Sequence, residues 1–255
     1  MLSIIIPHYQ TEEHIRLCLR SLRQYSREPL EVIVVDNNSQ DASVEYLQRL
    51  KWITLIINPT QAIGSRAHAE ALELGVQQAQ GDWLVFFHSD TIVLKPGWDS
   101  DLLQKIQDRQ AVGLSTTVRD VNRFEPVTEK WKRAVYAWRN ACKDFFKTGQ
   151  HNKKIMSFCF IIKKQVFQDT GYSFRDPVGD FITDLYYREI QSRYPFLLLT
   201  HAELAPMLWH TSNVTAILTG QITKQQLYEK FQQKNSMLMS RPEIQNIRNN
   251  DSLDN

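Results

Sequence analysis

The sequence predicts an α/β protein with a mostly parallel central sheet that is covered by helices on both faces. In the first hundred residues, short apolar runs alternate with amphipathic helical stretches, which is typical of strand–helix–strand units with right-handed crossovers. The apolar runs are continuous rather than alternating, as expected for strands buried on both faces. These two observations indicate a doubly wound sheet.

Four strands and three helices are expected in the first ninety residues. The strands occupy residues 2–6, 31–35, 53–57 and 83–87, and the helices between them occupy residues 11–25, 42–51 and 64–80. Thr11 is placed to cap the first helix, and Glu13 suits its positive end. Pro7 ends the N-terminal apolar run, which lacks a basic flank and is therefore interpreted as a strand and not as a signal peptide.

The rhythm changes after residue 90. A helix is expected at residues 99–108, and later helices at 164–168, 180–193 and 223–239. Strands are expected at residues 112–118, 155–162 and 196–200, with a short apolar segment at 207–210. Residues 1–240 are expected to form one domain. Residues 241–255 are rich in Asn and Asp and are expected to form a flexible tail.

The composition is that of an ordinary globular protein, with 255 residues, of which 42% are apolar and 23% charged. A net charge of +2 is too small to indicate nucleic-acid binding. No stretch approaches the roughly 20 apolar residues that span a bilayer. The three cysteines match no zinc pattern and no disulfide framework, which favours a reducing compartment. We therefore expect a cytoplasmic protein.

A polar triplet, His88-Ser89-Asp90, directly follows the apolar run at residues 83–87. Residues i and i+2 of an extended chain point to the same face, so His88 and Asp90 can converge on one ligand, such as a divalent metal. Open α/β sheets bind ligands just past the carboxyl ends of their strands. A carboxylate suits Mg²⁺ or Mn²⁺, whereas an imidazole is more acceptable to Mn²⁺. A plain turn after the strand is the alternative.

Two further polar residues stand at the ends of predicted elements. Asp36 follows the second strand, where a carboxylate can accept from a ribose hydroxyl or a base N–H, and an Asx turn is the alternative. Arg66 begins the third helix, where it can clamp a phosphate, and a solvated surface Arg is the alternative. No Gly-x-Gly-x-x-Gly follows a strand, which disfavours a dinucleotide site.

Asp180 and Asp184 are spaced to share one face of a helix. Neighbouring like charges can raise the pKa of one carboxyl, which suits a general base, and an N-cap is the alternative for Asp180. His210 follows an apolar run and gains interest only if the fold brings it to Asp90. His68 has no evident metal-ligand spacing and is interpreted as structural.

Taken in order, these segments resemble family 2 glycosyltransferases with the GT-A fold. The matching stretches are residues 3–9, 31–41, 64–75, 81–90, 157–167 with Gly171, 180–188 and 209–210. The resemblance covers about residues 1–215, and it is the ordered set that is specific. It implies a nucleotide-sugar-binding half at residues 1–95, an acceptor half at 96–215 and a C-terminal helix at 216–240.

The resemblance also implies roles for single residues. The nucleotide-sugar site would be lined by Pro7, Tyr9, Asp36, Asn38, Arg66 and Ser89. Asp36 would bond the base, and Arg66 would lie near the phosphates. Asp90 matches the last Asp of the family's Asp-x-Asp metal motif, and His88 stands where the first Asp is expected. His210 matches a late His that completes the metal shell in some members.

The chain departs from the family in the acidic motif that precedes the acceptor helix. The usual Glu-Asp positions fall on Phe181 and Ile182, which cannot serve as a base. Asp184 and Arg188 match the second Asp and the Arg that follow, whereas Asp180 takes over only if the backbone shifts by about one helical turn. The catalytic base is therefore expected to be Asp180 or Asp184.

The resemblance implies an inverting transferase that moves a sugar from a nucleotide-diphosphate sugar to a hydroxyl of a glycan or lipid-linked acceptor. Mn²⁺ or Mg²⁺ would be its cofactor, no nucleic acid would be bound, and surface polysaccharide biosynthesis is the family-level expectation. One alternative is a nucleotide- or glycan-binding protein that has lost catalysis. Another is a nucleotidyltransferase, although residues 7–10 lack the Gly-rich phosphate loop of that class.

Residues 119–154 interleave basic and aromatic side chains. Such a segment fits an acceptor-site flap or peripheral contact with an anionic membrane surface. It equally fits a surface helix whose aromatics complete the core. The sequence leaves these alternatives open, together with the oligomeric state.

Overall fold

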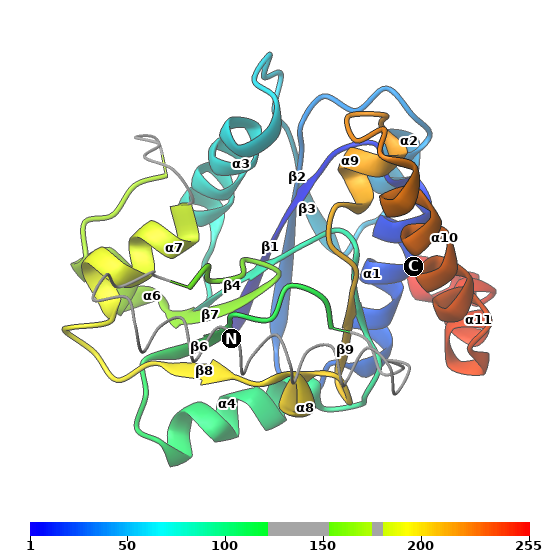
Figure 1. The fold of residues 1–255 in the computed structure, drawn as a ribbon. Helices are drawn as coiled ribbons and strands as arrows, with labels where there is room; N and C mark the ends of the chain where they lie inside the picture. The colour runs from blue at the N-terminus through cyan, green and yellow to red at the C-terminus, as the bar shows by residue number, and fades with distance from the viewer. Residues whose placement is uncertain (122–152, 175–180) are drawn as a thin grey trace.

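The structure, a computed structural model, describes residues 1–121, 153–174 and 181–255 (Figure 1). Its main sheet has seven strands in the order β3-β2-β1-β4-β7-β6-β8. The first half of this sheet is parallel and consists of β1 (Leu2–His8), β2 (Leu30–Asp36), β3 (Ile53–Ile57) and β4 (Trp83–Phe87). These four strands lie where the continuous apolar runs predicted them, and the α/β class is confirmed.

The second half of the sheet is mixed. β7 (Cys159–Lys163) runs antiparallel to both β4 and β6 (Gly113–Thr116), and β8 (Leu197–Leu199) lies parallel to β6 at the edge. β7 begins at Cys159 and is shorter than the strand expected at residues 155–162. The antiparallel insertion of β7 joins the second half of the chain to the parallel half through β4.

Helices cover both faces of the sheet because its strands are apolar on both sides. One face packs against α1 (Glu12–Tyr25), α2 (Ser43–Arg49) and α4 (Trp98–Asp108). The other face packs against α3 (Gly64–Gln78), α6 (Lys164–Asp169) and α7 (Phe181–Leu185). Figure 1 shows the two helical layers on opposite sides of β1 and β4.

The alternation of side chains along β1 supplies both layers. Ile4 and Ile6 belong to the core under α1, whereas Ile5 belongs to the core under α3. Gly75 lets α3 lie close to β1, because a Cβ at this position would stand 2.3 Å from the Ile5 side chain. Such a separation excludes any larger residue there unless the helix moves away from the strand.

A small second sheet brings distant segments together. β5 (Thr91–Val93) pairs antiparallel with β9 (Leu208–His210), and Thr91 lies opposite His210 in the register. The pairing was not predicted, because three residues carry too little pattern to identify a strand. It places His210 beside the residue that precedes β5, which is Asp90.

The C-terminal part of the chain is helical and lies on the α1 side of the molecule (Figure 1). After α8 (His201–Leu204) and α9 (Val214–Leu218) come α10 (Gln225–Met239), α11 (Pro242–Arg248) and the 3₁₀ helix η2 (Asp251–Asp254). The flexible tail expected at residues 241–255 is therefore wrong for this structure, in which that segment forms α11 and η2.

Arg20 of α1 explains why the C-terminal segment is ordered. Its guanidinium is 1% exposed and donates to Asp254 at 2.8 Å and to Asp251 at 2.6 Å. It also donates to the backbone carbonyl of Arg248. A buried guanidinium needs such partners, and the sequence pattern alone does not reveal a contact across more than 220 residues.

Three smaller features complete the fold. The helix expected at residues 180–193 is α7 followed by the π-helix η1 (Tyr186–Ile190), and residue 180 lies outside the described residues. Cys18 and Cys159 are buried and free. No helix in the described part of the chain is both long and apolar enough to cross a membrane.

Candidate metal and nucleotide site

Two buried side chains face each other at the carboxyl ends of β1 and β2. Asp36 ends β2 and is fully buried, and its Oδ2 accepts from the backbone N–H of Ser39 at 2.9 Å. His8 ends β1 beside it, with Nε2 at 2.8 Å from Ser43 Oγ and 3.8 Å from Asp36 Oδ1. Burial lowers the pKa of His8 to about 4, despite the opposing effect of Asp36. The ring is therefore neutral near pH 7.

Asp36 Oδ1 has no hydrogen-bond partner among the described residues, although the atom is buried. Buried carboxylate oxygens in folded proteins nearly always accept a hydrogen bond. At the carboxyl edge of a parallel sheet, the missing donor is readily supplied by a ligand. Asp36 is thus oriented to receive an N–H or O–H from a bound molecule.

His88, Asp90 and His210 form a second cluster at the same edge of the sheet. One ligand atom from each residue lies within 4.8 Å of the ligand atoms of the other two. Asp90 Oδ1 is 3.9 Å from His88 Nδ1 and 3.6 Å from His210 Nε2. The loop after β4 supplies the first two residues, and the β5–β9 pairing supplies the third.

His210 has a defined tautomer. Its Nδ1 lies 2.9 Å from the backbone carbonyl of Arg119. A carbonyl can only accept, so the ring proton is on Nδ1 and the lone pair of Nε2 faces Asp90. Phe158 stacks on the imidazole at 3.9 Å between ring centroids with an angle of 11° between planes. The ring is therefore fixed in its plane, and in the neutral imidazole the proton lies on Nδ1.

His88 is held from the other side. Its Nε2 lies 2.7 Å from Ser157 Oγ, which leaves Nδ1 facing Asp90. The ring of His68 from α3 meets it edge-on at 5.3 Å between centroids. Burial, reinforced by the neighbouring His68 and His210, lowers the pKa of His88 well below its ordinary value. His88 is thus a neutral imidazole.

The cluster fits a divalent metal ion. Asp90 Oδ1 and His210 Nε2 are both buried and have no hydrogen-bond partner among the described residues. Burial raises the pKa of Asp90, against the opposing effects of His210 and His14. A cation between these atoms would remove the cost of burying them unpaired. One carboxylate oxygen and two imidazole nitrogens form a donor set that suits Mn²⁺ and its neighbours in the first transition row.

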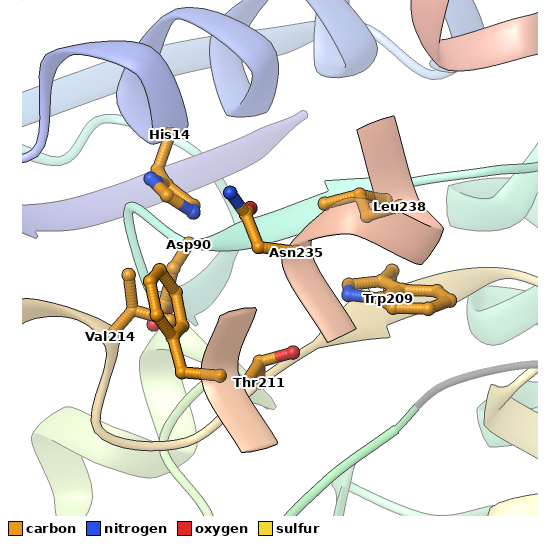
Figure 2. A pocket seen from close by; sticks show the side chains of 8 residues that line it. His14, Asp90, Trp209, Thr211, Val214, Asn235 and Leu238 are labelled. Carbon is orange, nitrogen blue, oxygen red and sulfur yellow. The ribbon is translucent and has the colours of Figure 1, made fainter. Parts of the chain in front are cut away.

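A pocket adjoins Asp90 on the side of the C-terminal helices. Figure 2 shows His14 of α1 and Asp90 on one side of it and Asn235 and Leu238 of α10 on the other. The remaining lining residues are Trp209, Thr211, Val214 and Phe231. Lys234 of α10 binds Asp120 at 2.6 Å and so holds this helix in place. The C-terminal helices therefore form one wall of the site.

The other residues expected at the nucleotide site lie at different depths. Ser89 is buried, and its Oγ is 3.3 Å from Thr11 Oγ1. Thr11 occupies the N-cap position of α1 but makes no capping bond, so its expected capping role is wrong. Pro7 is buried within β1, and Tyr9 is half-buried just beyond it.

Arg66 and Asn38 are exposed and make local polar contacts. Arg66 is exposed and pairs with Glu70 at 3.3 Å. His68 contacts His88 from the same helix, and residues two apart on a helix face different sides. Asn38 is exposed at a positive φ of 59° and accepts a hydrogen bond from Gln40. Their roles at the nucleotide site stay predictions.

The candidate bases of the acceptor half are described only in part. Asp184 accepts from Arg188 at 3.1 Å and from the hydroxyl of Tyr172 at 3.3 Å. Phe181 and Ile182 are buried in the core beneath α7, as expected of apolar residues at the acidic positions of the motif. Asp180 lies outside the described residues, as do the basic and aromatic residues between 122 and 152.

Sequence reasoning missed three side chains that shape the site. His8 stands opposite Asp36 in the parallel register, which the alignment of the two predicted strand ends could have revealed. Ser157 and His14 reach the cluster from segments far away in the chain, and no local pattern marks either contact.

Comparison with known proteins identifies the family. The model of "Glycosyl transferase family 2" matches residues 3–171, which is more than half of the chain. The chain belongs to glycosyl transferase family 2. The match includes the segments that carry Asp36, His88 and Asp90, and it ends before α7 and the C-terminal helices. The match therefore takes in the parallel half of the sheet together with β6 and β7.

The chain is similar to the amylovoran biosynthesis glycosyltransferase AmsB of Erwinia amylovora, with 32% identity over 110 residues. That alignment covers 40% of this chain and 33% of AmsB. The chain spans less than half of the length of the curated relatives it matches.

Solved structures share the fold at low sequence identity. S. aureus TarS 1-349, solved in complex with UDP-GlcNAc, superposes with a TM-score of 0.57 at 14% identity, covering 94% of this chain and 67% of that one. The mannosyltransferase PcManGT from Pyrobaculum calidifontis, in complex with GDP-Man and Mn²⁺, gives a TM-score of 0.55 at 17% identity, covering 78% and 54%. The family 2 chain thus has the GT-A fold.

Proposed function

We propose that this family 2 glycosyltransferase transfers a sugar, with inversion, from a nucleotide-diphosphate sugar to a hydroxyl group of a glycan or lipid-linked acceptor. Surface polysaccharide biosynthesis is the proposed context, and the name of AmsB, an amylovoran biosynthesis glycosyltransferase, supports it. The nucleotide-sugar donor is supported by the titles of two structural neighbours, which name UDP-GlcNAc and GDP-Man.

The observation that carries the proposal is the convergence of Asp36 with the His88–Asp90–His210 cluster at one edge of the sheet. Asp36 Oδ1, Asp90 Oδ1 and His210 Nε2 are buried polar atoms without partners among the described residues. A nucleotide diphosphate would supply N–H and O–H donors to the first atom and reach the other two through a shared cation. The two groups of atoms thus fit the two ends of one ligand.

Asp90, His88 and His210 would hold the divalent ion, which is Mn²⁺ or Mg²⁺ in this proposal. When bound, the ion supplies positive charge to the departing diphosphate. Asp90 would hold it through a carboxylate oxygen and each His through one ring nitrogen, since one such atom of each residue lies within 4.8 Å of the other two. Asp36 orients the donor by accepting a hydrogen bond from the base. Asn235 and Leu238 of α10 line the pocket beside Asp90.

The reaction itself is a single displacement. The base, Asp184 or Asp180, takes the proton of the acceptor hydroxyl, whose oxygen forms a bond to the anomeric carbon. The bond between that carbon and the phosphate oxygen breaks, and its electron pair leaves with the diphosphate. Attack opposite the leaving group inverts the anomeric centre. Asp184 lies within reach of Arg188 and Tyr172, which orient its carboxylate.

A screen of nucleotide sugars for release of free nucleoside diphosphate tests the proposal. The full chain is incubated with UDP-, GDP- and dTDP-sugars and Mn²⁺, with a mixed pool of glycan and lipid-linked acceptors. We expect release of nucleoside diphosphate from a donor with one particular base and one particular sugar, and only when metal is added. Binding of a nucleoside diphosphate without release from any donor would instead support the alternative below.

The alternative is a nucleotide- or glycan-binding protein that has lost catalysis. One observation favours it, which is the burial of Phe181 and Ile182 at positions where the family carries acidic residues. The replacement of the first metal-motif Asp by His88 points the same way. Calorimetry with UDP, GDP and dTDP, followed by the release assay, separates a binding protein from an enzyme.

A further inference from the structure

The metal cluster of this chain differs from an all-oxygen site because two of its three donors are imidazoles. Asp90 Oδ1 lies 3.9 Å from His88 Nδ1 and 3.6 Å from His210 Nε2. Both separations exceed hydrogen-bond length. They match ligand atoms that share one ion, because metal–ligand bonds of about 2.1 Å place neighbouring donors roughly 3–4 Å apart. The geometry therefore suits coordination rather than direct contact between the three side chains.

An imidazole can act as a ligand here only through a nitrogen that carries a lone pair. For His210 the backbone carbonyl of Arg119 settles the matter, because a carbonyl accepts only the proton of Nδ1. The tautomer of His210 thus depends on a backbone group and not on another side chain. In the neutral ring, the Nε2 lone pair therefore faces Asp90.

For His88, the tautomer depends on a single neighbouring side chain. Ser157 Oγ lies 2.7 Å from Nε2 and can accept its proton, which leaves the Nδ1 lone pair facing Asp90. If Ser157 donated instead, the ring proton would sit on Nδ1. At 3.9 Å from Asp90 Oδ1 that proton would make no hydrogen bond. A cation shared with Asp90 needs the lone pair of Nδ1, so the arrangement in which Ser157 accepts is the one that prepares the site for a metal.

We propose that Ser157 is a positioning residue that fixes the ring and tautomer of His88, and that the resulting site of two nitrogens and one oxygen selects Mn²⁺ over Mg²⁺. Mg²⁺ prefers an octahedral set of oxygen ligands and loses its waters reluctantly. Imidazole nitrogens bind first-row transition metals, Mn²⁺ included, more readily than they bind Mg²⁺. The selection follows from the replacement of an expected Asp by His88, with Ser157 as its support.

The inference rests on the proposed function for its use, but it is tested by metal binding alone. Calorimetry on the full chain, without any sugar donor, gives the affinities for Mn²⁺ and Mg²⁺. The wild type is expected to bind Mn²⁺ at least about tenfold more tightly than Mg²⁺. Ser157→Ala is expected to weaken Mn²⁺ binding by about 10- to 100-fold, the usual effect of losing a partner of a metal-bound His. Ser157→Thr keeps the hydroxyl and is expected to rescue the affinity.

Two further readouts separate positioning from a merely structural role. Long-range ¹H–¹⁵N spectra of the metal-free protein report which imidazole nitrogen carries the proton. They are expected to show His88 protonated on Nε2 in the wild type and a mixture of tautomers in Ser157→Ala. His88→Asp restores an all-oxygen pair next to Asp90, and it is expected to shift the preference toward Mg²⁺ even if Ser157→Ala proves unstable.

Three results would overturn the inference: equal affinity of the wild type for the two ions, unchanged Mn²⁺ binding in a folded Ser157→Ala, or a proton on Nδ1 of His88. If any of these accompanies intact release of nucleoside diphosphate, the inference fails and the proposed function stands. If selective Mn²⁺ binding accompanies no release from any donor, the proposed function fails and the inference stands.

Discussion

The carboxylates at the edge of the parallel sheet differ from that of Asp184 on α7 in whether their oxygens have hydrogen-bond partners. At the edge of the parallel sheet, Asp36 and Asp90 are buried, and each keeps one oxygen without a partner among the described residues. On the acceptor side, Asp184 is already bound by Arg188 and Tyr172. Unpaired buried oxygens are costly unless a ligand completes them. Asp36 and Asp90 thus keep an oxygen available for a ligand, whereas Asp184 already accepts from two neighbouring side chains.

This contrast agrees with the chemistry that each half would perform. A metal and a nucleotide diphosphate need preset ligands, because preorganised charge stabilises the leaving group most effectively. An acceptor hydroxyl needs only one base of suitable orientation.

The largest expected effect comes from removing the metal carboxylate. Asp90→Ala is expected to lower turnover of the nucleotide sugar by about a thousandfold, because the leaving diphosphate loses its charge stabilisation. Release of nucleoside diphosphate measures this effect. Asp108→Ala, at an exposed carboxylate of α4 far from the cluster in the fold, is the matched control and should behave as the wild type. Equal loss in both variants, or in neither, would refute the metal role.

The acceptor half is tested by Asp184→Asn, which keeps the shape of the side chain and removes its basicity. Turnover is expected to fall by about a hundredfold, the usual contribution of a general base, with donor affinity unchanged. Glu189→Gln is the control, because Glu189 makes a similar pair with Arg193 on the same stretch of helix. Full activity in Asp184→Asn would show that Asp184 is not the base and would leave Asp180 as the candidate.

Asp36→Ala tests the nucleotide end of the donor site. Loss of a buried acceptor of a ligand hydrogen bond is expected to weaken nucleotide binding by roughly thirtyfold, while kcat changes little. Calorimetry with the preferred nucleoside diphosphate gives the affinity, and steady-state kinetics separates KM from kcat. A fall in kcat at unchanged affinity would move Asp36 from donor binding to the chemical step.

Arg20→Ala tests how much the contacts of Arg20 with Asp251 and Asp254 stabilise the fold. The guanidinium is buried and binds Asp251 and Asp254, so its loss is expected to lower the free energy of unfolding by about 2 kcal/mol. Arg49→Ala removes an exposed pair with Glu45 and should cost less than about 0.5 kcal/mol. Chemical denaturation measures both variants. If the two variants unfold with equal free energies, the contacts of Arg20 contribute no more than a surface pair.

The sequence was most informative where the pattern is local. Continuous apolar runs located the four parallel strands, and the polar residues after two of them indicated the edge that holds Asp36 and Asp90. The meeting of Asp90 with His210 depends on the pairing of β5 with β9, which are three residues each. Such short strands are defined by their tertiary partners and not by periodicity.

Long-range polar contacts account for the remaining differences. The order of residues 241–255 depends on Arg20, which looks like any surface arginine in the sequence of α1. The support of His88 by Ser157 crosses 69 residues. Arg66 and Asn38 are exposed and make local contacts with Glu70 and Gln40.

The most direct test of the central claim joins the metal and the nucleotide in one measurement. The ³¹P spectrum of the nucleoside diphosphate that binds most tightly is recorded with the full chain and a trace of Mn²⁺. We expect strong broadening of both phosphate signals in the wild type and loss of the protein-dependent broadening in Asp90→Ala. Broadening that is equal in the two proteins, or that equals that of nucleotide and Mn²⁺ without protein, would contradict a diphosphate site built on Asp90.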